Sequence, residues 1–288
     1  MVKDYLSLIK FSHSIFALPF AFVGFFLGIH STDNIFSFSK LIPVLLCMLF
    51  ARSAAMAFNR WTDRDIDSLN PRTKQRELPA GILSSSSVLI FTIISCIAFV
   101  VTSYFINSLC FVLSPVALII VLGYSYTKRF TFLCHFILGV GLALAPIGAY
   151  LAVTGKFEVL PLLYSCAVLF WVAGFDIIYA LQDEEFDRSN ALKSLPSAFG
   201  VKHALRLSIF LHILSAVIMV IASMLVRQAY LSMQFFHFVG LAIFIFMLFY
   251  QHRLVKSNDL TKINMAFFTT NGLASLIFGL FFILDFYI

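Results

Sequence analysis

Charge is what this chain has little of. Only 12% of its 288 residues are Asp, Glu, Lys or Arg, and 61% are apolar. Soluble domains carry roughly a quarter charged residues, so this deficit argues against a soluble globular protein. The sequence instead repeats apolar runs of about 20 residues, the length that crosses the hydrocarbon core of a bilayer as a helix. Because lipid offers the backbone no hydrogen-bond partners, we expect an all-α membrane protein in which residues 1–288 form one membrane domain.

The sequence shows no paired cysteine spacing, and we expect no cleaved signal at its amino terminus. The first residues do not show a charged region followed by a short apolar core and a small-residue cleavage site, as a signal peptide would, nor the Arg- and Ser-rich composition of a transit peptide. This favours the inner membrane of a bacterium or an archaeon, and we expect the bacterial inner membrane. The sequence has no His/Cys cluster for zinc. Five cysteines lie in apolar segments without paired spacing, so we interpret them as free core residues: Cys47, Cys96, Cys110, Cys134 and Cys166.

Nine apolar segments are long enough to be membrane spans. They lie near 9–30, 40–58, 84–106, 109–126, 132–153, 159–180, 204–226, 233–251 and 264–286. Lys and Arg decide the orientation, since cytoplasmic loops carry an excess of both. Sixteen lie on the side of the amino terminus, against three (Lys40, Lys156 and Arg227) on the other. The amino terminus is therefore predicted to be cytoplasmic. The net charge of +6 follows from the same rule, so no nucleic-acid partner is needed.

An acidic cluster follows the second apolar segment. On an α-helix, with Arg52 at zero, Asn59, Asp63 and Asp67 fall at roughly −20°, +20° and +60°. These four side chains would form one polar stripe, and Asp65 would point away from it. Since the stripe ends a span on the Lys/Arg-rich side, we expect it at the cytoplasmic face.

A second acidic cluster follows the sixth apolar segment, with Asp183 placed 120 residues after Asp63. With Asp176 at zero, Tyr179, Asp183 and Asp187 fall at roughly −60°, −20° and +20° of a continuing helix. The two clusters are four spans apart, which hints at a duplicated four-helix unit followed by a ninth helix.

The residue types in these stripes point to a metal ion and a phosphate group. Facing carboxylates repel one another unless cations separate them, and Mg²⁺ takes one or two carboxylates together with water and phosphate oxygens. Arg52 and Asp176 lie within or at the edge of spans, where an ionisable group usually marks a site. Basic side chains that suit the outer oxygens of a diphosphate flank both stripes: Arg72, Lys74, Arg76, Lys128, Arg129, Arg188 and Lys193.

These motifs resemble those of the UbiA superfamily of intramembrane prenyltransferases, and the resemblance covers essentially the whole chain. The motif Asn-x-x-x-Asp-x-x-x-Asp is met by Asn59, Asp63 and Asp67, and the motif Asp-x-x-Tyr-x-x-x-Asp-x-x-x-Asp by Asp176, Tyr179, Asp183 and Asp187. The stretches 124–131 and 76–81 are similar to two loops of the same family. The resemblance implies nine helices around a central cavity that opens to the cytoplasmic side.

The resemblance also implies an activity. Members bind a polyprenyl diphosphate through Mg²⁺, ionise its allylic carbon–oxygen bond and let an aromatic ring capture the carbocation. It thus implies that Mg²⁺ is bound by Asn59, Asp63, Asp67, Asp183 and Asp187. The catalytic residues that it implies are five aspartates: Asp63, Asp67, Asp176, Asp183 and Asp187. The diphosphate would meet Arg72, Arg76, Lys128, Arg129, Arg188 and Lys193. The acceptor would meet Arg52, with Lys10, His13 and Tyr179 as further candidates, while Asp176 orients or deprotonates its hydroxyl.

Several positions depart from the commonest family pattern. Arg60 stands where many members have Asp, Glu77 where many have Pro, and His13 where Lys is frequent. The surrounding strings resemble the branch that prenylates 4-hydroxybenzoate in quinone biosynthesis. Part of this branch uses 1,4-dihydroxy-6-naphthoate in menaquinone synthesis. Both acceptors are carboxylated phenols, so Arg52 does not separate them. A hypothesis of a different class is a cation-coupled transporter, in which carboxylates lie near mid-membrane. The oligomeric state stays open.

Overall fold

The described chain is helical almost throughout. The computed structural model describes residues 2–10, 16–32 and 36–288. Within these ranges the extended structure is one isolated bridge between Lys256 and Asp259. Eight helices of the same ranges are long and apolar enough to cross a membrane, which agrees with the expected all-α membrane class. The segment predicted at 9–30 contains helix α2 (Leu18–Ser31). Its 14 residues span about 21 Å at 1.5 Å per residue, so the count of nine spans stays a prediction.

The helices group into two compact units, which are described separately. Unit 1 comprises residues 1–14 and 37–127, and unit 2 comprises residues 15–36 and 128–288. Each unit contains one of the two acidic clusters. Whether residues 1–288 act as one domain stays a prediction.

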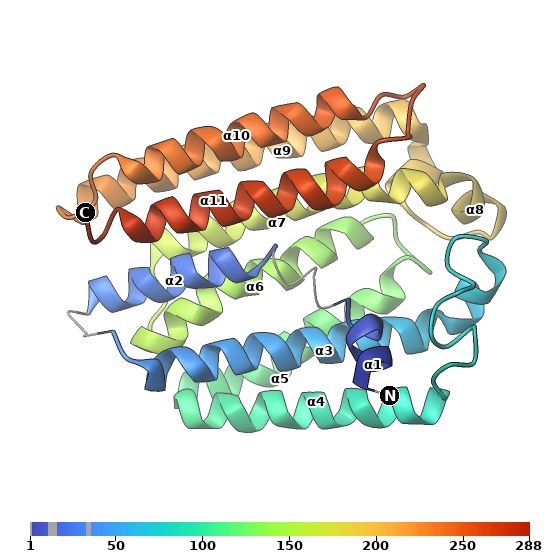
Figure 1. Cartoon of the computed structure of the whole chain (residues 1–288), viewed down its shortest axis with the longest axis horizontal. Coiled ribbons are helices and arrows are strands. Elements are labelled where there is room, and N and C mark those ends of the chain that lie inside the picture. Colours follow the sequence, from blue (N-terminus) through green and yellow to red (C-terminus); the bar gives the residue numbers. More distant parts are fainter. Residues whose placement is uncertain (1, 11–15, 33–35) are drawn as a thin grey trace. The chain divides into compact units, whose positions relative to one another are not determined.

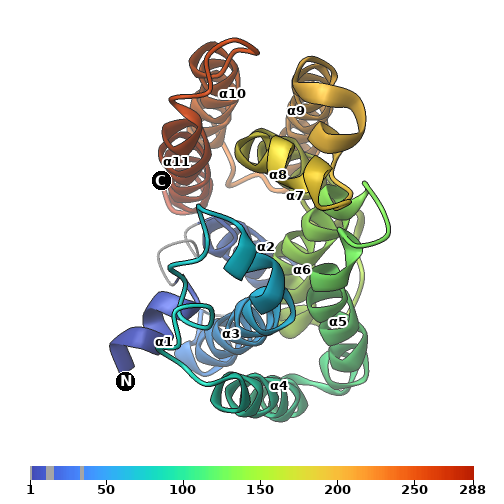
Figure 2. The same ribbon diagram turned by 90° about the vertical axis from the view of Figure 1, so that its right-hand side faces the viewer.

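Unit 1 is built around one long helix. Helix α3 (Phe38–Leu69) begins after Ser37, whose hydroxyl accepts the Ser39 N–H. Its 32 residues extend about 48 Å, whereas the hydrocarbon core needs only about 30 Å. Helices α4 (Ser85–Ile106) and α5 (Ser108–Thr127) pack beside α3 (Figure 2). Asn107 alone connects α4 to α5, and it lies in the short gap between the segments predicted at 84–106 and 109–126. A 20-residue span from Phe38 would end just before the first acidic cluster, which therefore occupies the last third of α3.

A short amino-terminal helix is packed on this part of unit 1. Helix α1 (Val2–Leu8) contacts α3. Its Leu8 is buried with Ala57 of α3, Leu83 of the following loop and Val88 of α4. Ser84, the N-cap of α4, accepts the Ser87 N–H and ends that loop. The loop over residues 70–84 is thus held between α1, α3 and α4.

In unit 2, glycines allow two helices to approach closely. Helix α2 packs on α6 (Cys134–Thr154). A Cβ at Gly24 would lie 1.9 Å from the Pro146 carbonyl oxygen, and one at Gly28 would lie 2.9 Å from Val153 Cβ. Glycines four residues apart form the small-residue motif that brings membrane helices into backbone contact. Only glycine fits this helix pair without displacing one backbone from the other.

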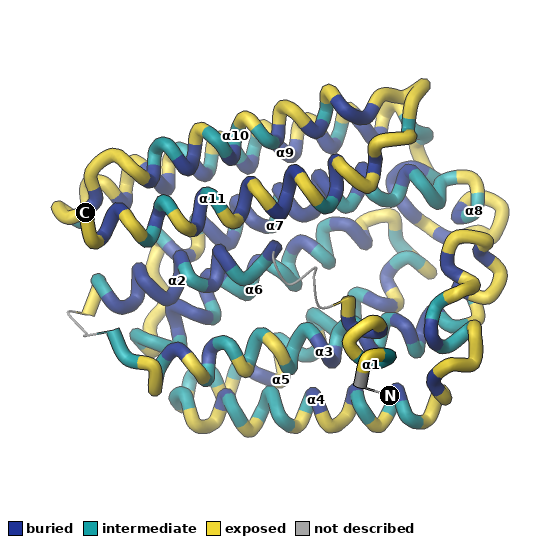
Figure 3. Tube along the Cα trace, in the orientation of Figure 1, coloured by how far each residue is buried: buried dark blue, intermediate teal, exposed yellow. Residues whose placement is uncertain are grey.

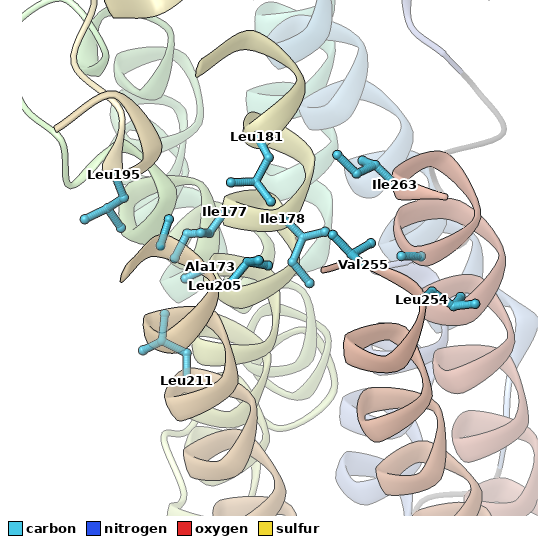
Figure 4. Packing of buried hydrophobic residues seen from close by; sticks show 12 residues of the cluster. Ala173, Ile177, Ile178, Leu181, Leu195, Leu205, Leu211, Leu254, Val255 and Ile263 are labelled. Atoms are coloured by element: carbon cyan, nitrogen blue, oxygen red, sulfur yellow. The ribbon is translucent and has the colours of Figure 1, made fainter. Parts of the chain in front are cut away.

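The rest of unit 2 packs around helix α7 (Val159–Ala180). Helix α7 contacts α6 and α9 (Leu195–Ala229), and α10 (Phe236–Leu254) pairs with α11 (Asn271–Leu284) (Figure 1). Helix α7 has the largest buried share of the eight candidate spans (Figure 3). Ile177 and Ile178 of α7 meet Leu205 of α9 and Val255 beyond α10 in one apolar cluster (Figure 4). This cluster fixes the end of α7 that carries the second acidic motif.

Two irregular segments modify these helices. Residues Leu181–Asp183 form a 3₁₀ turn after α7, and Glu184–Ser189 form the short helix α8. Helix α9 begins with a capping box between Ser194 and Ser197 and is kinked at Gly200. Gly200 has a φ of 78°, which a residue without a Cβ adopts at little cost. A π-helical stretch, Met265–Thr270, precedes α11.

Candidate active site

The first acidic cluster lies on an unbroken helix. Because α3 continues to Leu69, Asn59, Asp63 and Asp67 stand on consecutive turns of one face, as predicted. Asp63 and Asp67 are only 2% and 4% exposed. The Asn59 side-chain amide donates a hydrogen bond to Asp63 Oδ2 at 3.2 Å. The helix therefore places the Asn59 side-chain amide directly against the Asp63 carboxylate.

The loop after α3 folds back onto this cluster. Arg76 Nη1 donates to both carboxylate oxygens of Asp67, at 2.7 and 2.8 Å. The Thr73 hydroxyl donates to the Asp67 carbonyl at 3.1 Å. Arg72 is exposed, and its backbone N–H donates to Asn70 Oδ1. Of the residues predicted to meet a diphosphate in unit 1, Arg76 thus lies on the cluster and Arg72 lies in the adjoining turn.

Two acceptor candidates of unit 1, Arg52 of α3 and Lys10, contact each other. Arg52 Nη2 donates to the Lys10 carbonyl at 3.2 Å. Arg52 Nε is buried and has no hydrogen-bond partner among the described residues. Lys10 is exposed and has a φ of 45°. His13 lies outside the described residues. Arg52 therefore keeps a buried N–H donor that suits a carboxylate.

Glu77, which departs from the commonest family residue, joins α1 to the same loop. Its Oε1 accepts the Ser7 hydroxyl at 2.6 Å, and its Oε2 is buried without a hydrogen-bond partner among the described residues. This side chain anchors the amino-terminal helix to the loop that carries Arg76.

The second acidic cluster crosses a break in the helix. The predicted stripe assumed one helix from Asp176 to Asp187, and this assumption is wrong because α7 ends at Ala180. The break places Glu184, Glu185 and Asp187 in the first turn of α8. Carboxylates are favoured at a helix amino terminus and disfavoured at a carboxyl terminus. Starting a new helix therefore relieves a repulsion that a continuing α7 would impose.

Asp187 is buried beside charged residues of both signs. It is 8% exposed, and its burial, together with the nearby Asp183 carboxylate, raises its pKa, whereas the Ser194 hydroxyl and Lys128 act in the opposite direction. The Lys193 backbone N–H donates to the Lys128 carbonyl at 2.7 Å, and its Nζ donates to the Phe130 carbonyl at 3.2 Å. The segments around residues 128–130 and 193–195 therefore lie side by side.

The two remaining residues of unit 2 that were predicted to bind the diphosphate, Arg129 and Arg188, are both exposed. Arg188 is exposed and pairs with Glu184, one turn earlier on α8. Arg129 is also exposed. The structure thus brings Lys128 and Lys193 together beside Asp187, and it places Arg188 on the outer face of α8.

Asp176 has a partner that the motifs do not contain. Its Oδ2 lies 2.7 Å from Nδ1 of His135, the second residue of α6. His135 Nε2 accepts the Leu195 N–H at 3.3 Å. The sequence offered one signal for His135, since a histidine in an apolar segment costs free energy and often marks a site. The contact itself depends on tertiary packing.

An aromatic cluster surrounds this face of α7. The Tyr179 ring stacks on Phe267 of the π-helical stretch, with ring centroids 4.1 Å apart. Phe267 also meets Phe175 at 5.3 Å and Phe16 at 5.5 Å. Aromatic π faces attract cations through their quadrupoles. Asp176 and Tyr179 therefore border a surface that suits a carbocation or an aromatic ring.

The oxygen donors of both clusters fit Mg²⁺. Within either unit, the described residues include no group of three His, Cys, Asp or Glu side chains that could hold a metal ion alone. Magnesium is usually held by one or two carboxylates, with water and substrate phosphates filling its octahedron. Asp63 with Asn59, and Asp187 with Asp183, offer donor sets of this kind. Asp67 is shared with Arg76, so its carboxylate already faces one positive charge.

Comparisons with known proteins identify the family of this chain. The UbiA prenyltransferase family matches residues 17–273. The 4-hydroxybenzoate octaprenyltransferase of Photobacterium profundum is 28% identical over 250 residues, covering 86% of this chain and 84% of the relative. The apo structure of a UbiA homologue from Aeropyrum pernix K1 is 30% identical and superposes with a TM-score of 0.83, covering 95% and 98% of the two chains.

A further structure shares the fold at lower identity. The UbiA homologue from Archaeoglobus fulgidus, solved bound to GPP and Mg²⁺, is 24% identical with a TM-score of 0.75, covering 99% of this chain and 100% of that chain. The predicted resemblance and the predicted enzyme class, a prenyltransferase, are confirmed by the family match. With 257 of its residues spanned by that match and both acidic motifs within it, this chain belongs to the UbiA prenyltransferase family.

Proposed function

We propose that the chain transfers a polyprenyl group from a polyprenyl diphosphate to the ring of an aromatic carboxylate of the 4-hydroxybenzoate type, in a reaction that depends on Mg²⁺. The observation that carries the proposal is that each unit pairs a buried aspartate with a basic segment. Asp67 binds Arg76, and the Asp187 carbonyl accepts the N–H of Leu192, whose neighbour Lys193 donates its own N–H to the Lys128 carbonyl. Carboxylates that hold a metal, together with cations for the outer oxygens, are what a diphosphate requires.

In this proposal the charges act on the departing diphosphate. Mg²⁺ held by the aspartates of the two clusters would supply positive charge to the diphosphate as it leaves. Arg76, Lys128 and Lys193 bind its outer oxygens and hold them in place. Charged groups fixed before the reaction stabilise the transition state without reorganising, which lowers its free energy. Asp63 and Asp187, being buried, are held in such fixed positions.

The acceptor side rests on Arg52 and on the aromatic face of α7. The free Nε–H of Arg52 suits a carboxylate, and a buried charged hydrogen bond of this kind is strong. Phe267 and Tyr179 exclude water from the carbocation and present π faces to it. The name of the Photobacterium profundum relative supports 4-hydroxybenzoate as the acceptor. The second acid, 1,4-dihydroxy-6-naphthoate, carries the same two groups and belongs in the same assay.

We further propose that residues 1–288 act as one domain with nine membrane-spanning helices, a central cavity and the acidic clusters on the cytoplasmic side of a bacterial inner membrane. The sixteen-to-three distribution of Lys and Arg supports this orientation. The short helix α2 supports the ninth span, because its glycines pack it against the spanning helix α6.

The test is an assay on membranes that contain the chain. They are incubated with a polyprenyl diphosphate, Mg²⁺ and each of the two acids, and the prenylated product is measured by mass spectrometry. We expect D63A and D183A to lower the product at least about 100-fold, the range seen when a transition-state charge partner is removed. D65N is the matched control, since Asp65 lies on the same helix but is exposed. EDTA should abolish product and added Mg²⁺ restore it. Full product from D63A would refute the proposed site.

A further inference from the structure

His135 connects three helices of unit 2 through both of its ring nitrogens. It lies at the start of α6, and the residue is 2% exposed. Nδ1 lies 2.7 Å from Asp176 Oδ2 on α7. Nε2 lies 3.3 Å from the backbone nitrogen of Leu195, the first residue of α9. Neither acidic motif includes this residue.

The two contacts together define the tautomer of the ring. The Leu195 N–H is a donor, so Nε2 must offer it a lone pair. A neutral imidazole then carries its proton on Nδ1, which donates to Asp176 Oδ2. A carboxyl oxygen that accepts this short bond is best satisfied as a carboxylate. Asp176 thus remains an acceptor at Oδ2, and among the described residues no hydrogen bond reaches its Oδ1.

We propose that His135 is a positioning residue that holds Asp176 as an oriented carboxylate, so that Oδ1 takes the proton of the acceptor's hydroxyl group. This inference rests on the proposed function. The acceptor O–H bond breaks, its proton moves to Asp176 Oδ1, and its electron pair stays on the phenolate oxygen. The allylic carbon–oxygen bond breaks, the diphosphate leaves with its electron pair, and a ring carbon bonds to the allylic carbocation. The ring carbon releases its proton to the diphosphate, and Asp176 returns its proton to the oxygen.

The same residue has a structural task, and the two tasks use different atoms. The Leu195 N–H is one of the amino-terminal groups of α9 that has no partner within the helix. Nε2 satisfies it, and Cys134 lies beside the Lys193 carbonyl in the same contact region. If His135 served packing alone, the Nε2 contact would account for it. The Nδ1 contact is the one that reaches the reacting group.

Two substitutions separate these tasks. An asparagine amide nitrogen can occupy the place of Nδ1, and a glutamine amide oxygen can occupy the place of Nε2. H135N therefore keeps the donor to Asp176 and loses the Leu195 contact, whereas H135Q keeps the Leu195 contact and loses the donor. Each variant acts as the control for the other, and thermal unfolding in detergent reports the structural cost of each.

We expect H135Q to lower kcat about 10- to 100-fold, by analogy with the loss that follows removal of a partner that orients a metal-binding side chain. Its KM for the polyprenyl diphosphate should stay unchanged, because the diphosphate residues are untouched. H135N should keep kcat within about threefold of the unsubstituted chain while unfolding at a lower temperature, since it loses one buried hydrogen bond. Retained kcat in H135Q, or equal losses of kcat in both variants, would overturn the inference. If the unsubstituted chain makes no prenylated acid, the proposed function fails instead.

Discussion

The two acidic clusters share a spacing but are built in different ways. The first lies on the uninterrupted helix α3, where Asn59 supports Asp63 from one turn earlier and Arg76 holds Asp67 from the next loop. The second is divided by the 3₁₀ turn after α7. Asp176 stays on the spanning helix and is held by a residue 41 positions earlier in the chain, while Asp187 lies on α8. The same i, i+4 pattern can therefore be organised by one helix or by tertiary contacts.

The largest expected loss of activity comes from Asp187, which lies on α8 after the 3₁₀ turn. Asp187 and Glu185 lie on the same short helix, but Asp187 is buried and Glu185 is exposed. D187N keeps the size of the side chain and removes its charge, so we expect about a 100-fold loss of kcat with little loss of folded protein. E185Q should leave kcat unchanged. Kinetics of both variants in membranes measure the difference. Equal activities would show that α8 takes no part in the reaction.

The next expected effect separates structure from chemistry in the first cluster. Removing one partner of a mostly buried ion pair leaves an unpaired charge and costs about 3–5 kcal/mol. We therefore expect D67A and R76A each to unfold at a clearly lower temperature, because Asp67 is 5% and Arg76 23% exposed at the side chain. The exchanged pair, D67R with R76D, rebuilds the attraction with opposite polarity.

The exchanged pair should regain most of the thermal stability and none of the activity. An arginine at position 67 cannot act as an oxygen ligand for a metal, so kcat should stay near that of D67A. Melting in detergent and product formation in membranes are measured on the same preparation. If the exchange restored both properties, Asp67 would be a structural residue and its proposed place in the metal site would be wrong.

The sequence predicted those features that depend on neighbouring residues. Every predicted apolar segment contains a helix, because in lipid each segment must satisfy its own backbone. The face shared by Asn59, Asp63 and Asp67 follows from helical periodicity alone. Helix ends were predicted less well. α3 continues to Leu69 although the second segment was expected to end at 58, and α9 begins at Leu195 although its segment was expected to start at 204.

What the sequence did not predict depends on contacts between distant segments. The turn at Leu181–Asp183 interrupts the helix that periodicity predicts and places the carboxylates that follow it at the amino terminus of α8. Helical periodicity does not predict this break, since α3 carries Asp63 and Asp67 near its carboxyl end without one. The contact of His135 with Asp176 requires α6 and α7 to be packed first. An ionisable residue in an apolar segment indicates a candidate functional site, but the residue that it contacts becomes known only from the fold.

The smallest expected effect comes from a second ion pair on α3. Arg64 lies 3.7 Å from Asp65, with side chains 38% and 84% exposed. Exposed pairs contribute about 0.2–1 kcal/mol, because water screens the attraction. The Arg64 guanidinium also lies 4.9 Å from the centre of the Trp61 ring and donates to the Trp61 carbonyl. D65N should therefore leave the melting temperature almost unchanged, whereas R64A should lower it slightly more because it also removes the contacts with Trp61. If D65N lowered the melting temperature as much as D67A does, the position of a carboxylate along α3, rather than its burial, would determine its contribution to stability.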